Sequence, residues 1–263
     1  MTELEYLESI FFKVLDDLKD YLDELTLVGG WLSYVYAKYL WYNLAIKPAT
    51  TSDIDFGLGA GKARIYPRTI FELLSSLGYK ERHPQMDRLY PVVLYKEGKV
   101  RIDFIAPPKI QKDVIERIVG SEIDINKIEK FDFLLKHRLV VDIKNKKDIH
   151  RIHCPKPSAF LYHKTATFID RDDEQKQAKD LHYMYFILRH APDIDTILKE
   201  IIQYNKQGDF KEIHENLSRY FDRKTSKGCL MVEKENGPDE YIDDLRQDIF
   251  ERFKNLQESL ILK

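Results

Sequence analysis

The sequence predicts an α+β protein, in which a mixed β-sheet flanked by helices is followed by an all-helical bundle. Short apolar runs that end in Gly or Pro recur through residues 25–106, as strands do. From about residue 156 onward, apolar residues instead recur every three or four positions, which is typical of helices. We expect two domains, a sheet domain over residues 1–150 and a helical domain over residues 151–263.

Helices and strands should alternate in the first domain. Apolar residues at three- and four-residue spacing predict helices over residues 3–24, 31–42, 67–77 and 109–119. Alternating or continuous apolar runs predict strands at residues 25–28, 52–57, 89–95, 100–106 and 139–143. The Gly-containing link Lys96-Glu-Gly-Lys99 suits a hairpin between the strands at 89–95 and 100–106.

The second domain should consist of helices alone. Helical periodicity covers residues 157–189, 193–204, 210–221 and 238–261. The polar stretch 222–239, which contains Gly237-Pro238, predicts a loop before the last helix.

Composition excludes several classes of protein. The 263 residues carry a net charge of only −2, so binding of nucleic acid would depend on a local patch. The two cysteines are far apart and form no CxxC motif, which argues against a disulfide framework and a cysteine zinc site. The acidic N-terminus lacks the features of a signal peptide, and no apolar run approaches the ~18 residues of a membrane span. We expect a cytoplasmic protein.

Three aspartates carry the functional prediction. Asp53 and Asp55 lie two positions apart on a predicted strand, so their side chains point to the same face. Asp103 lies on a later strand between two apolar residues and can join them if the strands are neighbours. Three carboxylates in one place repel one another unless a cation neutralises them, and Mg²⁺ or Mn²⁺ prefers such oxygen ligands. We predict a divalent metal site that serves an in-line displacement on a nucleoside triphosphate.

A glycine pair precedes the second predicted helix. Gly29 and Gly30 lack a Cβ, so the backbone can approach phosphates closely, and the helix N-terminus favours an anion. Ser33, near the start of that helix, and Ser52, directly before Asp53, are candidate nucleotide ligands. Each feature also has a plainer interpretation, because Gly-Gly is often only a turn and Asp-x-Asp often only a solvated strand edge. Their order along the chain favours the functional interpretation.

With these residues the chain resembles the nucleotidyltransferase superfamily that has the DNA polymerase β-like fold. The shared pattern is an apolar strand, Gly-Gly or Gly-Ser, a helix, Asp-x-Asp and a later acidic residue. It reads here LVGGWLSYVYAKYL, TSDIDFGL and VRIDFIAP. The 22 residues between Gly30 and Asp53 make the chain similar to the AbiEii/AbiGii-type branch, which includes toxins of bacterial toxin–antitoxin systems.

Residues 155–189 strengthen the likeness to this branch. In the branch, a lysine in a helix is followed by a stretch that ends in Lys-Asp or Arg-Asp, and Lys164 and Asp180 occupy those places here. The resemblance implies that Lys164 meets nucleotide phosphates and that Asp180 is needed for activity. The branch also carries an arginine shortly before Asp-x-Asp, where this chain has residues 48–52, preceded by Lys47. This departure bears on the choice of nucleotide.

The resemblance implies an enzyme that transfers a nucleoside monophosphate from an NTP to an acceptor and releases pyrophosphate. The acceptor would be RNA such as tRNA, and an antitoxin protein would be a partner. Residues 130–164, with nine lysines and arginines against three acidic residues, are the candidate RNA-binding segment. The helical domain would supply Lys164 and Asp180 to the active-site cleft. Two alternatives stay open: a transferase for small molecules or proteins, and a non-catalytic protein that binds a nucleotide or a partner.

Overall fold

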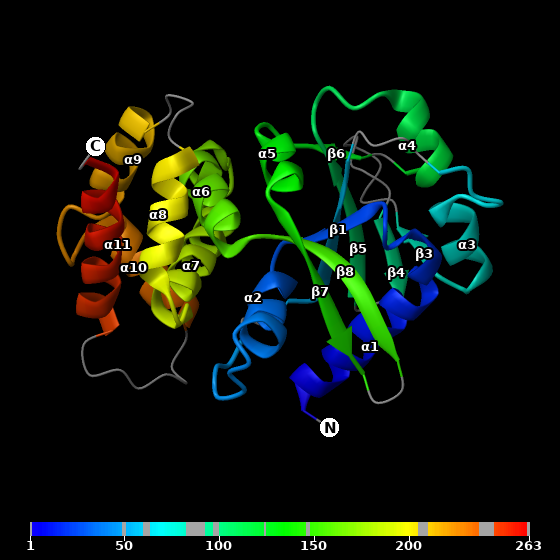
Figure 1. Cartoon of the computed structure of the whole chain (residues 1–263), viewed down its shortest axis with the longest axis horizontal. Helices are drawn as coiled ribbons and strands as arrows, with labels where there is room; N and C mark the ends of the chain where they lie inside the picture. Colours follow the sequence, from blue (N-terminus) through cyan, green and yellow to red (C-terminus); the bar gives the residue numbers. More distant parts are fainter. Residues whose placement is uncertain are drawn as a thin grey trace. The chain divides into compact units, whose positions relative to one another are not determined.

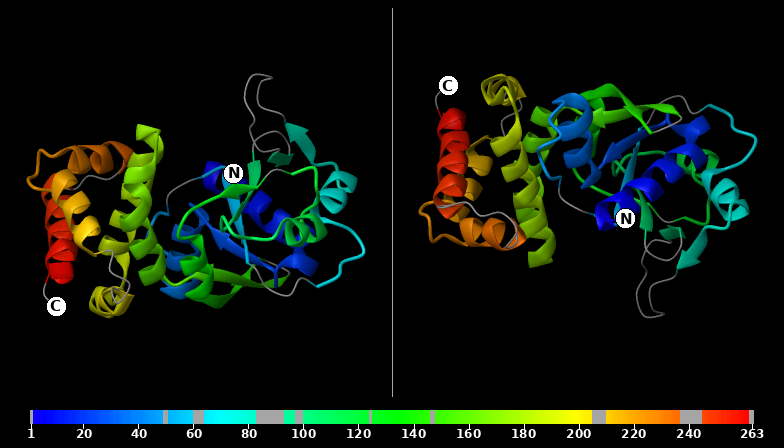
Figure 2. Two further views of the ribbon diagram at one scale, coloured as in Figure 1. Left: turned by 90° about the horizontal axis from the view of Figure 1, so that it is seen from above. Right: turned by 90° about the horizontal axis from the view of Figure 1, so that it is seen from below.

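The structure is a computed structural model that describes residues 2–48, 51–59, 64–82, 93–96, 100–123, 125–145, 148–204, 210–236 and 245–261. The chain divides into two compact units, Met1–Lys156 and Pro157–Lys263. The first unit contains a mixed sheet with flanking helices, and every described element of the second is a helix (Figures 1 and 2). The structure confirms the predicted α+β fold class, in which the sheet precedes the helices.

One sheet of eight strands forms the centre of the first unit (Figure 1). Its order is β3-β4-β5-β2-β1-β8-β7, and β6 pairs with β5 outside this path. The strands are β1 (Leu25–Val28), β2 (Asp53–Leu58), β3 (Lys80–Arg82), β4 (Val93–Lys96), β5 (Val100–Ala106), β6 (Asn126–Lys127), β7 (Arg138–Lys144) and β8 (Ile149–Pro155). β2 runs parallel to β5 and antiparallel to β1. The strand that carries Asp53 and Asp55 is therefore an inner strand and not an edge.

The strands predicted at residues 25–28, 52–57, 100–106 and 139–143 are confirmed, with ends that differ by at most one residue. β4 and β5 pair antiparallel, as the predicted hairpin requires, while residues 89–92 and 97–99 lie outside the described residues. The sequence does not predict β8, because its buried face includes His150 and so lacks a plain alternation of apolar residues. β3 and β6 have three and two residues and are too short to give a pattern.

In the first unit, capping residues help to determine where helices begin, in addition to the spacing of apolar residues. The helices are α1 (Glu3–Asp17), η1 (Lys19–Tyr21), α2 (Trp31–Val35), η2 (Tyr36–Leu40), α3 (Ile70–Ser76), α4 (Lys112–Ile118) and α5 (Phe131–Lys136). The helix predicted over residues 3–24 ends at Asp17 and is followed by the 3-10 turn η1. α3 begins after Thr69 and not at Pro67, because Thr69 and Glu72 form a capping box.

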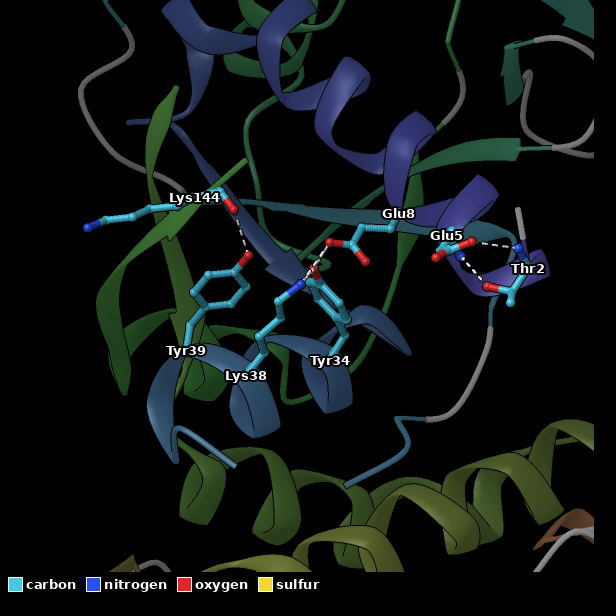
Figure 3. A network of polar contacts seen from close by, with 7 residues as sticks. All are labelled: Thr2, Glu5, Glu8, Tyr34, Lys38, Tyr39 and Lys144. Atoms are coloured by element: carbon cyan, nitrogen blue, oxygen red, sulfur yellow. Dashed lines mark hydrogen bonds and ion pairs between the residues drawn. The ribbon is translucent and has the colours of Figure 1, made fainter. Parts of the chain in front are cut away.

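Polar contacts fix α2 and η2 against α1 and β7 (Figure 3). The Glu8 carboxylate accepts hydrogen bonds from the Tyr34 hydroxyl at 2.7 Å and from Lys38 Nζ at 2.8 Å. The Tyr39 hydroxyl donates to the carbonyl oxygen of Lys144 at 2.8 Å. Because these bonds join three parts of the unit, the helix that follows the glycine pair has a fixed position against the sheet.

The second unit is a bundle of helices in its described part (Figure 2). The helices are α6 (Pro157–Thr167), η3 (Phe168–Asp170), α7 (Glu174–His190), α8 (Ile194–Tyr204), α9 (Phe210–Tyr220), α10 (Lys227–Asn236) and α11 (Leu245–Ile261). The helix predicted over 157–189 breaks after η3, because Asp173 caps α7 by accepting a hydrogen bond from the Gln175 amide at 2.8 Å. The prediction of a loop over 222–239 is wrong for α10, a polar helix with a weak apolar pattern. No described helix is both long enough and apolar enough to cross a lipid bilayer.

Apolar side chains fill one face of the two central strands. Ile54 and Phe56 of β2 and Ile102 and Phe104 of β5 are each at most 2% exposed. The rings of Phe56 and Phe104 stack with their centroids 6.2 Å apart. Because side chains alternate along a strand, burial of these residues directs the polar residues between them to the other face.

Gly57 lies on that other face, next to the ring of Phe131. A Cβ at Gly57 would lie 2.7 Å from Cζ of Phe131, a residue of α5 that is 2% exposed. Gly57→Ala should lower the free energy of unfolding by about 1–3 kcal/mol, because the buried ring has to move. Urea unfolding followed by circular dichroism measures this. Gly59→Ala is the matched control, since its Cβ would approach other atoms no closer than 3.9 Å. Equal losses in both variants would contradict the prediction.

Candidate active site

β2 and β5 bring the three predicted aspartates onto one face of the sheet. In the parallel pairing of these strands, Asp55 lies opposite Asp103 and Asp53 lies opposite Arg101. Paired residues on neighbouring strands, and residues two apart along one strand, point to the same side. The Asp103 side chain is only 6% exposed, whereas that of Asp53 is 36% exposed. The group therefore reaches from the surface into the buried part of the sheet.

Arg101 is a member of this group that the sequence prediction leaves out. Its Nη2 lies 2.7 Å from Asp103 Oδ2 and 3.2 Å from Asp53 Oδ2. One guanidinium nitrogen thus bridges two of the three carboxylates and compensates part of their charge. Alternation along β5 is the signal that identifies it, because Arg101 precedes Asp103 by two positions and shares its face.

Gly29 makes room for the third carboxylate. It has a φ of +73°, in the left-handed region that favours glycine. A Cβ at this position would lie 1.9 Å from Oδ2 of Asp55. Gly29 therefore lets the Asp55 carboxylate lie directly against the backbone, which is a different role from the approach to phosphates that the sequence predicts.

The other predicted nucleotide ligands lie next to these residues in the chain. Gly30 precedes α2, and its carbonyl oxygen accepts a hydrogen bond from the Ser33 hydroxyl at 2.9 Å. Ser33 is 4% exposed, so its hydroxyl serves the first turn of its own helix. Ser52 is exposed, and its Oγ lies 3.4 Å from Asp53 Oδ1. Of the two serines, Ser52 is the one whose side chain lies at the surface beside an aspartate.

The carboxylates have the chemistry of a divalent-metal site without its closed arrangement. Among the residues that the structure describes, no three or more His, Cys, Asp and Glu side chains are arranged to hold a metal ion. The Arg101 guanidinium binds one oxygen each of Asp53 and Asp103. Neighbouring strands lie about 4.8 Å apart, so carboxylates of Asp55 and Asp103 can reach one ion. Carboxylate oxygens are the type of ligand that Mg²⁺ and Mn²⁺ prefer, so the donor set fits these ions in its chemistry.

In the second unit, Asp180 forms ion pairs with both Lys164 and Arg171. Lys164 Nζ donates a hydrogen bond to Asp180 Oδ1, and Arg171 Nε donates to Asp180 Oδ2 at 2.9 Å. Lys164 and Asp180 are 7% and 4% exposed. Burial by itself raises the pKa of Asp180, but the charges of Lys164 and Arg171 outweigh it and hold this pKa below its usual value. α6 and α7 thus keep Asp180 ionised beside two cations.

The basic segment 130–164 is divided between two environments. Lys164 is buried and ion-paired in the second unit. The exposed part comprises Arg138, Lys144 and Arg151 on the hairpin of β7 and β8, together with Lys130 and Lys136 at the two ends of α5. Arg151 Nε lies 3.3 Å from Asp142 Oδ1, which offsets part of the positive charge. Residues 146–147 lie outside the described residues.

The exposed basic side chains of this hairpin lie on the same face of the sheet as the aspartates. Thr26 of β1 pairs with Gly57 of β2 and with His153 of β8, so the three share one face. Gly57 follows Asp55 by two positions, which carries that face along β2. Arg138 Nη1 donates to the Thr26 hydroxyl at 3.2 Å and so lies on this side. A basic strip therefore continues the aspartate face across the sheet.

The chain is similar to a known family over more than half of its length. A family model described as Nucleotidyltransferase matches residues 11–195, which is more than half of the chain. Among solved structures, an antigenic nucleotidyltransferase-like protein from Paracoccidioides brasiliensis is similar at 13% identity, with 79% of this chain and 91% of that chain covered and a TM-score of 0.40. No curated protein matches the chain. The family match includes the aspartates of the sheet as well as Lys164 and Asp180.

Gly29→Ala should destabilise the protein more than backbone strain alone explains. A left-handed conformation costs a non-glycine residue about 1–2 kcal/mol, and the new Cβ would also displace the Asp55 carboxylate. Gly78→Ala is the matched control, because Gly78 has a φ of +81° and nothing within 4 Å of its Cβ position. Urea unfolding of both variants measures the difference. In the double variant Gly29→Ala/Asp55→Ala part of the extra loss should return, and a purely additive result would contradict the contact.

Asp180→Asn should lower the free energy of unfolding by about 3–5 kcal/mol at pH 7, because it leaves Lys164 buried without an anion. Lys164→Met in the same chain should restore part of this loss. The native pKa of Asp180 is depressed, so its contribution is complete above the unfolded pKa of about 3.9 and is lost as the pH falls through the native pKa. Urea unfolding from pH 7 to pH 3 measures whether the difference between wild type and Asp180→Asn shrinks in acid. A difference that grows in acid would contradict the assignment.

Proposed function

The chain belongs to the nucleotidyltransferase family, and we propose that it transfers a nucleoside monophosphate from an NTP to RNA, with tRNA as the acceptor. The observation that carries the proposal is the register of two parallel strands, which aligns Asp55 with Asp103. The space that Gly29 leaves for the Asp55 carboxylate supports it further. Together these features bring acidic oxygens to one place, as a transfer of phosphorus-containing groups requires.

Each candidate site residue of the first unit has a role in this proposal. Asp53, Asp55 and Asp103 hold Mg²⁺ or Mn²⁺, which neutralises the triphosphate and the leaving pyrophosphate when it is bound. Asp53 and Asp55 would be the main ligands of the ions, and Asp103 would help to hold them or would accept the proton of the attacking hydroxyl. Backbone amides of the glycine pair bind a phosphate, and Ser52 adds an exposed hydroxyl to the nucleotide site.

The second unit contributes positive charge in this proposal. With Asp180 ionised, the group of Lys164, Arg171 and Asp180 carries a net charge of +1. Lys164 binds triphosphate oxygens, and Asp180 orients the cations. The Arg171 side chain is 31% exposed against 9% for Lys164, so Arg171 is the more accessible cation of the group.

RNA is the proposed acceptor because the basic strip on β7 and β8 lies on the aspartate face of the sheet. Arg138 and Arg151 on this strip suit contacts to RNA phosphates. The AbiEii/AbiGii-like sequence pattern supports a toxin of a toxin–antitoxin system, with an antitoxin protein as partner and the cytoplasm as location. A small-molecule or protein acceptor is the second candidate, and the net charge of only −2 favours it. A non-catalytic binding role is the third, and the engagement of Arg101 with two carboxylates favours it.

A transfer assay tests the proposal. Purified full-length protein, Mg²⁺, each α-labelled NTP and total tRNA should give labelled RNA with one preferred nucleotide. Asp55→Asn should lower the rate on the order of 100-fold or more, the effect of removing one charge-stabilising group from an active site. Asp113→Asn is the matched control, because Asp113 is exposed on α4 and pairs with Arg117 of the same helix.

The outcomes separate the three candidates. Label in RNA that is lost with Asp55→Asn supports RNA transfer. Binding of an NTP that needs Asp53 and Asp55, without labelled RNA, supports a small-molecule or protein acceptor. Absence of both NTP binding and transfer in the folded protein would contradict the enzymatic proposal.

A further inference from the structure

A single arginine holds two of the aspartates in the structure. Arg101 Nη2 lies within hydrogen-bond distance of Oδ2 of both Asp103, at 2.7 Å, and Asp53, at 3.2 Å. The first aspartate lies on the same strand as Arg101, and the second lies directly opposite it on β2. The guanidinium therefore occupies a position that the strand register itself defines.

The contact places a positive charge beside a buried carboxylate. The Asp103 side chain is 6% exposed, and an ionised carboxylate at such burial needs a cation or several hydrogen bonds. Asp53 and Asp55 add negative charge on the same face. Arg101 supplies a positive charge between two of these three acids, and it does so from a side chain that is 39% exposed.

The same carboxylates are the ones that would hold a divalent cation. Arg101 Nη2 already lies against Asp53 and Asp103, and a second cation beside them would meet strong repulsion from the guanidinium. The Asp103 side chain is buried and has little freedom to move, whereas the Arg101 side chain is partly exposed and can turn into solvent. Binding of the ion is thereby coupled to departure of the guanidinium.

We propose that Arg101 is a built-in counter-cation, which binds Asp53 and Asp103 in the metal-free protein and which a divalent ion must displace. Arg101 then weakens metal binding and keeps the metal-free carboxylates together. The inference rests on the proposed function in one respect, because it takes Asp53 and Asp103 as metal ligands. A merely structural role makes a different prediction: loss of Arg101 would then disturb the carboxylates and weaken metal binding.

A titration of the full-length protein with Mn²⁺, in the absence of nucleotide, distinguishes the two roles. Electron paramagnetic resonance measures free Mn²⁺ at each step. Arg101→Gln should bind Mn²⁺ about tenfold more tightly than wild type, because a like charge near the ion is removed. Arg117→Gln is the matched control, because Arg117 also pairs with an aspartate, Asp113 at 3.1 Å, on an exposed helix. Its affinity should equal that of wild type.

Two further variants place the effect at these carboxylates. Arg101→Lys keeps the positive charge and should bind Mn²⁺ more weakly than Arg101→Gln. If Arg101→Gln does not fold, Arg101→Met, which also removes the charge, takes its place and should likewise bind Mn²⁺ more tightly than wild type. In Arg101→Gln/Asp53→Asn the gain in affinity should disappear, because one of the contested ligands is gone. Equal or weaker binding by Arg101→Gln, or a gain that survives Asp53→Asn, would overturn the inference.

The transfer assay separates failure of this inference from failure of the proposed function. Labelled RNA together with unchanged Mn²⁺ affinity in Arg101→Gln overturns the counter-cation role and leaves the function standing. Tighter Mn²⁺ binding without transfer to any acceptor supports the counter-cation role and overturns the proposed activity.

Discussion

The parallel pairing of β2 with β5 places three carboxylates and one guanidinium in a fixed pattern, with Asp55 opposite Asp103. A shift of one residue would turn the acids of one strand to the apolar face, because side chains alternate along a strand. Burial of Ile54 at 0% and of Ile102 at 1% opposes such a shift. The hydrophobic core and the polar site therefore depend on the same register, and a change that loosens one disturbs the other.

The turn at Gly29 adds a second constraint from a different direction. β1 is paired on both sides, with β2 and with β8, and α2 is held to α1 through Glu8 and Tyr34. The turn between β1 and α2 has thus little freedom, and its left-handed glycine receives the Asp55 carboxylate at a distance that excludes any side chain. The backbone at Gly29 therefore limits the positions that the Asp55 carboxylate can take.

Local pattern predicts the strands and the shared face of Asp53 and Asp55, because both depend on alternation within a few residues. The partner strand of β2 does not follow from local pattern, and this pairing decides that Arg101 lies opposite Asp53. The same limit explains β8, where His150 occupies a buried position beside Asp16 of α1, 3.0 Å away, that an apolar residue usually takes. Features that depend on contacts between distant segments are the ones that sequence alone leaves undetermined.

Asp103 in the sheet and Asp180 in the helical unit are both buried, and both are compensated by basic side chains. The partners differ in freedom. Lys164 is 9% exposed as a side chain and is buried together with Asp180, so separating them would leave two charges without solvent. Arg101 is 39% exposed, so it can leave Asp103 and become solvated at little cost. Arg171, the second basic partner of Asp180, is 31% exposed and can turn to solvent, but Lys164 stays buried beside the acid. We therefore infer that Asp103 can exchange its cation, whereas Asp180 keeps at least Lys164.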